Sequence, residues 1–282
     1  MTTENAVETV AVPGGTVTLR DARSGTSRAV DLMPFEIGRT PVTAQAWTAA
    51  GSPRPTGPAG GRLPVQPVSW FDAVAWCNAA SARAGLRPAY RVAGRRVAWD
   101  VHADGYRLPT EGEWEHAARA GSTGPTYGPL ETTAWTALDD VPGPQPVAGK
   151  APNAFGAFDM LGNVWEWCWD YADPARYADY RVLRGGGWAD PRWSVRASVR
   201  RGSLPEARLE DVGFRVARGV VGAPGGDTAQ GWSARRDRER ADVRGPLPLG
   251  WTPLRELVDH PAAGEVGAAT GDDASHGAGC HS

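Results

Sequence analysis

Thirteen tryptophans among 282 residues, against six tyrosines and five phenylalanines, restrict most strongly how this chain can fold. Each indole ring buries a large apolar area, and its N–H group needs a hydrogen-bond partner. The chain also has 36 glycines and 24 prolines, which mark bends and special backbone angles. Together these residues predict a loop-rich fold whose core or binding groove is built from indole rings.

Local capping signals place three helices. Thr43 is expected to cap a helix that runs through Ala50, and a second helix is expected over residues 69–84. Thr110 is followed three residues later by Glu113, which is the pattern of a capping box at the start of a third helix. Short strands and turns are expected to fill most of the remaining chain.

Charge and cysteine content bear on partners and compartment. The formal net charge of −2 gives no electrostatic basis for binding nucleic acid or an anionic membrane surface. No stretch approaches the ~18 apolar residues of a membrane helix, and the N-terminus has no pattern of a signal peptide. The three cysteines, Cys77, Cys168 and Cys280, are widely spaced and odd in number, which predicts a protein of the reducing cytoplasm.

The composition of the chain changes after Arg218. Residues 1–221 are expected to form one domain, and residues 222–282 a mostly disordered tail, because the tail is rich in Gly, Ala and charged residues. The exception is the apolar segment 247–257. It is expected either to pack back onto the domain or to serve as a partner-binding peptide.

Four segments, in order along the chain, resemble the formylglycine-generating enzyme, or sulfatase-modifying factor, family. These segments are residues 67–74 (PVSWFDAV), 106–115 (YRLPTEGEWE), 159–167 (DMLGNVWEW) and 184–188 (RGGGW), the last followed by 212–215 (VGFR). The resemblance covers about two thirds of the chain. It implies the α+β, irregular and loop-rich fold of that family, which is related to C-type lectin domains.

The resemblance also implies a calcium site in the segment 153–169, which we expect to be a loop. Members of the family bind Ca²⁺ there through two side chains and two backbone carbonyls, and calcium prefers such oxygen ligands. The four corresponding positions are Asp159, Gly162, Val164 and Glu166. The alternative is a turn whose carboxylates meet arginines such as Arg184 or Arg215.

Copper is not expected, although the family's best-known enzymes depend on it. In those enzymes two cysteines, separated by four residues, follow the Gly-Gly-x-Trp turn and hold Cu(I), which prefers thiolates. The corresponding positions here are Asp190 and either Ser194 or Val195, and no cysteine occurs from residue 169 to 279. Formation of formylglycine by the family's copper chemistry is therefore not expected.

The sequence is compatible with two functions. The first is a binding or accessory module for a peptide, a small anionic ligand or a partner protein. Its expected groove, rich in indole and guanidinium groups, is formed by Trp165, Trp188, Arg192, Trp193 and Arg196. The alternative is a repurposed oxidoreductase that acts in a biosynthetic or protein-modification pathway, alone or with a second protein. Metal content and oxygen uptake distinguish the two.

Overall fold

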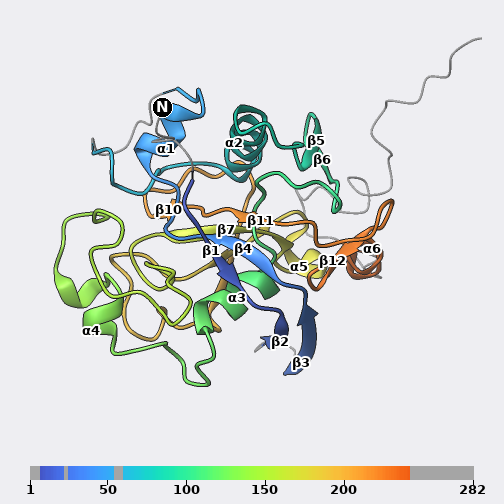
Figure 1. The fold of residues 1–282 in the computed structure, drawn as a ribbon. Coiled ribbons are helices and arrows are strands. Elements are labelled where there is room, and N and C mark those ends of the chain that lie inside the picture. The colour runs from blue at the N-terminus through green and yellow to red at the C-terminus, as the bar shows by residue number, and fades with distance from the viewer. Residues whose placement is uncertain (1–6, 22–24, 54–59, 242–282) are drawn as a thin grey trace, which may run out of the picture.

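The computed structural model describes residues 7–21, 25–53 and 60–241. Its N-terminal part contains a three-stranded sheet in which β4 (Phe35–Gly38) lies between β1 (Thr9–Val12) and β11 (Ala217–Arg218), with both neighbours antiparallel (Figure 1). A separate hairpin pairs β2 (Gly15–Asp21) with β3 (Thr26–Leu32). The beginning and the end of the family-like segment thus meet in one sheet.

The central sheet has the strand order β10-β7-β8-β9. Strand β7 (Trp165–Tyr171) is buried along its whole length, as expected for an inner strand covered on both faces. It pairs in parallel with β10 (Val212–Gly213) and antiparallel with β8 (Arg181–Arg184). Strand β9 (Arg200–Ser203) pairs with β8 and is the edge of the sheet.

The three predicted helices are confirmed with their caps. Helix α1 (Ala44–Ala49) begins after Thr43, whose side chain accepts from the backbone N–H of Ala46, and α2 spans Trp70–Arg83. The predicted capping box of Thr110 and Glu113 opens α3 (Glu111–Arg119). No helix in the described ranges is long and apolar enough to cross a membrane.

The remaining elements are short. They are the hairpin of β5 (Tyr90–Ala93) and β6 (Arg96–Trp99), the helices α4 (Leu130–Thr133) and α5 (Pro174–Tyr177), and a 3₁₀ turn at Ala137–Asp139. Much of the chain between them has no regular secondary structure. The fold is therefore α+β and loop-rich, as predicted.

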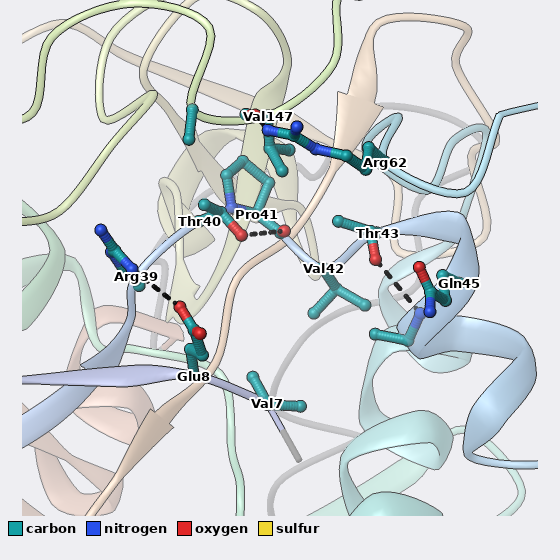
Figure 2. A pocket seen from close by; sticks show the side chains of 12 residues that line it. Val7, Glu8, Arg39, Thr40, Pro41, Val42, Thr43, Gln45, Arg62 and Val147 are labelled. Carbon is teal, nitrogen blue, oxygen red and sulfur yellow. Dashed lines mark hydrogen bonds and ion pairs between the residues drawn. The ribbon is translucent and has the colours of Figure 1, made fainter. Parts of the chain in front are cut away.

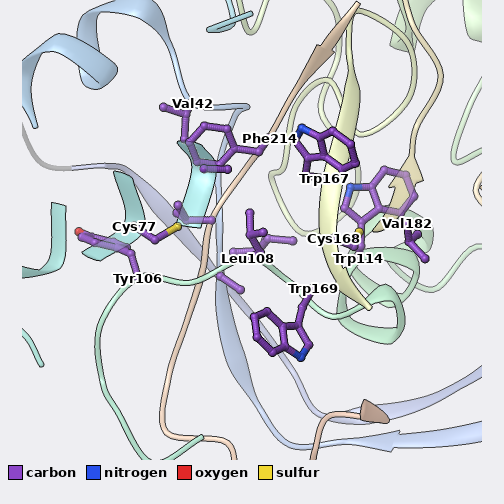
Figure 3. Close-up of a cluster of buried hydrophobic side chains, with 14 of the residues drawn as sticks. Val42, Cys77, Tyr106, Leu108, Trp114, Trp167, Cys168, Trp169, Val182 and Phe214 are labelled. Carbon is purple, nitrogen blue, oxygen red and sulfur yellow. The ribbon is translucent and has the colours of Figure 1, made fainter. Parts of the chain in front are cut away.

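The core is built from indole rings, as the composition predicts (Figure 3). Trp70 and Trp167 are fully buried, and their N–H groups donate to the backbone oxygens of Cys168 (3.0 Å) and Val68 (2.9 Å). Cys77 lies in the same core, and burial raises the pKa of its thiol well above the ordinary value. These hydrogen bonds satisfy the indole N–H groups of Trp70 and Trp167 inside the core, so the two rings need no contact with solvent.

Regular structure continues past the predicted domain boundary at residue 221. Residues up to Ala241 continue the fold with β12 (Thr228–Ala229), β13 (Trp232–Ser233) and α6 (Ala234–Ala241). The side-chain amide of Gln230 donates to Glu113 Oε1 (3.1 Å), and the backbone carbonyl of Gln230 accepts from the hydroxyl of Thr110 (2.8 Å). These two residues form the α3 capping box, so the segment packs against the domain. The predicted docking segment 247–257 lies outside the described residues.

Candidate functional site

The segment that joins Asp159 to Glu166 is a tight reversal followed by a strand. Asp159, Gly162 and Asn163 have positive φ angles of 52°, 73° and 62°. A Cβ atom on Gly162 would lie 2.1 Å from the carbonyl oxygen of Trp135, so only glycine fits there. The backbone N–H of Gly162 donates to the carbonyl of Gly185 (3.0 Å). This bond joins the reversal to the Gly-rich turn before Trp188.

The sequence analysis predicts a loop at Glu166, but this residue lies on the buried strand β7. Its Oε2 accepts from Arg215 Nε (2.6 Å) and from the indole N–H of Trp114 (2.7 Å), while Oε1 accepts from Arg215 Nη2 (2.7 Å). Both side chains of the ion pair are essentially unexposed. Glu166 and Arg215 thus form the kind of carboxylate–arginine pair that the sequence analysis gives as the alternative to a calcium site.

Arg215 uses its remaining N–H groups to hold the surrounding backbone. Nη1 donates to the carbonyl of Gly38 (2.9 Å), and Nη2 donates to those of Phe158 and Asp159 (3.0 Å each). Bidentate pairing of guanidinium with carboxylate is strong and geometrically specific. One side chain therefore connects β4, the reversal and β7. Arg184, the other arginine predicted as a partner of these carboxylates, pairs instead with Glu111 and Glu115 on α3.

Asp159 is the less satisfied of the two carboxylates. Its Oδ2 accepts from the backbone N–H of Ala148 (2.7 Å), but its buried Oδ1 has no hydrogen-bond partner among the described residues. Burial raises the pKa of this carboxyl. Ala148 also lines a cavity of about 340 Å³, shown in Figure 2 with Arg39 and Arg62 on its walls.

The predicted calcium ligands fit a cation only in part. The Oδ1 atom of Asp159, which has no hydrogen-bond partner among the described residues, is an oxygen ligand that a buried cation would satisfy. Glu166, in contrast, is already neutralised by Arg215. Within the described ranges, no group of three or more His, Cys, Asp or Glu side chains is placed to hold a metal ion. A calcium ion at this place would depend on Asp159 and on backbone carbonyls.

The segment after Trp188 is a well-bonded turn. Asp190 Oδ2 accepts from the backbone N–H of Gly187 (2.7 Å) and from the indole N–H of Trp165 (2.6 Å). Ser194 and Val195 are buried. Cys77 and Cys168, the two cysteines in the described part of the chain, are both buried in the core. The carboxylate of Asp190 thus holds the turn together.

The predicted groove is corrected at Trp165, which is completely buried beneath this turn and cannot contact a ligand. Trp188 is half-buried, and its N–H has no partner among the described residues. Arg192, Trp193 and Arg196 are exposed, with 69% of Trp193 accessible to solvent. Arg196 Nε donates to the carbonyl of Trp193 (2.8 Å). These three residues form an exposed corner, which we call the Trp193 corner.

With this geometry established, comparison with known proteins decides the family. Residues 1–220 match the model of the sulfatase-modifying factor enzyme 1-like domain. The chain belongs to this family. The Gly-rich turn, the reversal at Gly162 and the Glu166–Arg215 pair described above all lie within the matched residues.

Relatives of this family member include proteins with and without a named enzymatic activity. It is 34% identical to inactive Cα-formylglycine-generating enzyme 2 of Mus musculus, over 66% of this chain and 59% of that protein. It is 32% identical to the formylglycine-generating enzyme of Streptomyces coelicolor, over 55% and 52%. It is also 31% identical to the chaperone protein LppX of Paenibacillus barcinonensis, over 56% and 71%. The chain thus spans little more than half the length of the first two.

Solved structures support the fold over nearly their whole length. Treponema denticola variable protein 1 superimposes with a TM-score of 0.66 at 29% identity, covering 74% of this chain and 94% of that one. PvdO from Pseudomonas aeruginosa gives a TM-score of 0.63 at 27% identity, covering 76% and 95%. The predicted loop-rich fold, related to C-type lectin domains, is confirmed.

Proposed function

We propose that this member of the sulfatase-modifying factor family is a binding or accessory module that does not form formylglycine by copper chemistry. One observation carries the proposal: the Oδ2 atom of Asp190 accepts hydrogen bonds from both Gly187 and Trp165. The resemblance places the first copper-binding thiol at this position. A hard carboxylate in such bonds, followed by the buried Ser194 or Val195 at the second position, provides no soft ligand for Cu(I).

The names of the relatives support a role without oxidation. The mouse relative is named as an inactive member, and the Paenibacillus relative is named as a chaperone protein. We propose a protein or peptide partner for this chain as well, with the Trp193 corner as one contact surface. An exposed indole beside guanidinium groups combines apolar area with hydrogen-bond donors, as protein interfaces do.

The test is oxygen uptake on a reduced cysteine-containing peptide in the presence of Cu(I). We expect uptake no faster than that of Cu(I) and peptide alone, and no copper retained after gel filtration. The Streptomyces coelicolor formylglycine-generating enzyme serves as the positive control under the same conditions. Stoichiometric copper together with turnover of the peptide would overturn the proposal.

Calcium is a separate proposal and rests on the orphaned oxygen of Asp159. We expect Ca²⁺ at millimolar concentration to raise the melting temperature of EDTA-treated protein, because a ligand that binds only the folded state stabilises it. In the Asp159→Asn variant this increase should vanish. Without calcium the variant should be at least as stable as the parent, because burial disfavours the carboxylate. A melting temperature of the parent that is unchanged by Ca²⁺ would exclude the site.

A further inference from the structure

Two neighbouring cavities on the side of β9 share four lining residues. The larger, of about 1000 Å³, lies between β9, the segment 172–180 and the start of β3. The smaller, of about 180 Å³, continues past β3 towards α6. The shared residues are Arg20, Thr26, Ser27 and Arg200. Together the two cavities form one groove, which we call the arginine groove.

The arginine groove is strongly positive. Seven arginines line it, against three acidic residues, Glu111, Asp170 and Asp173. The arginines are Arg20, Arg28, Arg196, Arg200, Arg201, Arg236 and Arg240. Within the described part of the chain, Arg200 is the one of these seven that forms an ion pair, at 2.6 Å from Glu111. The excess of positive charge attracts an anionic partner, although the chain as a whole has a net charge of −2.

Three of these arginines are held by contacts with neutral groups. Arg28 donates to the carbonyl of Gly231 (3.0 Å), and Arg240 donates to that of Ala172 (3.2 Å). Arg201 stands over the ring of Trp165, with 4.9 Å between its Cζ and the ring centroid. Such contacts hold the guanidinium groups in place, which lowers the entropic cost of binding an anion.

The groove follows the open edge of the central sheet. Strand β9 is hydrogen-bonded to β8 on one side and is the last strand of the sheet on the other. Consecutive residues of a strand point to opposite faces, yet Arg200 and Arg201 both line the larger cavity. The larger cavity thus runs along the strand, where it reaches both residues. An edge strand presents backbone N–H and C=O groups that can pair with an added strand.

We propose that the arginine groove binds an extended acidic peptide segment of a partner protein, which adds as a strand to the edge of β9. Main-chain bonds to β9 would supply affinity, and alternate carboxylates would meet the guanidinium groups. The stacked rings of Tyr177 and Tyr180, with centroids 5.5 Å apart, line the same cavity and can cover apolar side chains of the peptide. This inference rests on the proposed binding role and names the chemistry of the partner.

The test is fluorescence anisotropy of the full chain with a labelled ten-residue peptide of alternating Glu and Val. We expect it to bind at least tenfold more tightly than the same peptide with Gln in place of Glu, and this preference should shrink with added salt. The double variant Arg20→Glu/Arg201→Glu should lose at least tenfold in affinity. The control Arg87→Glu/Arg91→Glu makes the same change in net charge at exposed arginines outside both the groove and the Trp193 corner and should stay within twofold. Melting curves establish that both variants fold.

Pairing with β9 has its own readout. N-methylation of alternate peptide residues on the edge facing β9 should weaken binding at least fivefold, whereas methylation of the other edge should not. Equal effects on both edges, or displacement of the peptide by lower concentrations of pyrophosphate than of unlabelled peptide, would overturn strand addition. Loss of affinity in a separate Arg192→Glu variant, with Arg20→Glu/Arg201→Glu unaffected, would move the site to the Trp193 corner and leave the proposed binding role intact.

Discussion

Replacement of Arg215 by methionine should lower the free energy of unfolding by about 3–5 kcal/mol, because it leaves the buried carboxylate of Glu166 without its countercharge. The substitution also removes the donors to the carbonyls of Gly38, Phe158 and Asp159. Since these bonds connect β4, the reversal and β7, the loss should affect the whole domain. Urea unfolding of the two proteins at neutral pH measures the difference.

Two controls separate the buried pair from a general effect of charge. Removal of both partners, by Arg215→Met with Glu166→Met, should recover part of the loss, because two apolar side chains leave no buried charge. Replacement of Arg39 by methionine, which breaks the exposed pair with Glu8 (3.0 Å), should cost less than about 1 kcal/mol. If Arg215→Met costs no more than Arg39→Met, the pair does not hold the domain together.

The elements that could be predicted from the sequence are those fixed by neighbouring residues. The caps at Thr43 and Thr110 depend on contacts across three positions, so local spacing was enough to place α1 and α3. The family motifs predicted the fold, because their order along the chain reflects a shared fold.

Contacts between distant segments could not be predicted in this way. Glu166 was expected in a loop because its neighbours are polar and include glycine, but pairing with β8 and β10 makes it part of a strand. No local pattern connects it with Trp114, 52 positions earlier. Trp165 was assigned to a groove from its residue type alone. Its burial depends on the turn held by Asp190, 25 positions later.

The first part of the predicted tail, up to Ala241, depends on distant contacts as well. Its many charged residues and glycines are typical of disorder, yet a few residues pack this part against the domain. Trp232 lies against Trp99 and Trp169, with ring centroids 5.2 and 5.6 Å away, and its N–H donates to Asp237 (2.7 Å). Average composition does not reveal such anchors, because one indole contributes little to the average and much to the packing.

Replacement of Trp232 by alanine should therefore lower the free energy of unfolding by about 2–4 kcal/mol, through lost apolar contact and a cavity beside Trp99 and Trp169. Trp193 provides a matched control, because it is 69% exposed and its replacement by alanine should cost less than about 0.5 kcal/mol. Urea unfolding followed by circular dichroism measures both. Equal and small effects would show that residues 228–241 contribute nothing to the fold, whereas the expected difference makes this segment part of the domain that positions Thr110, Glu113 and the adjoining arginine groove.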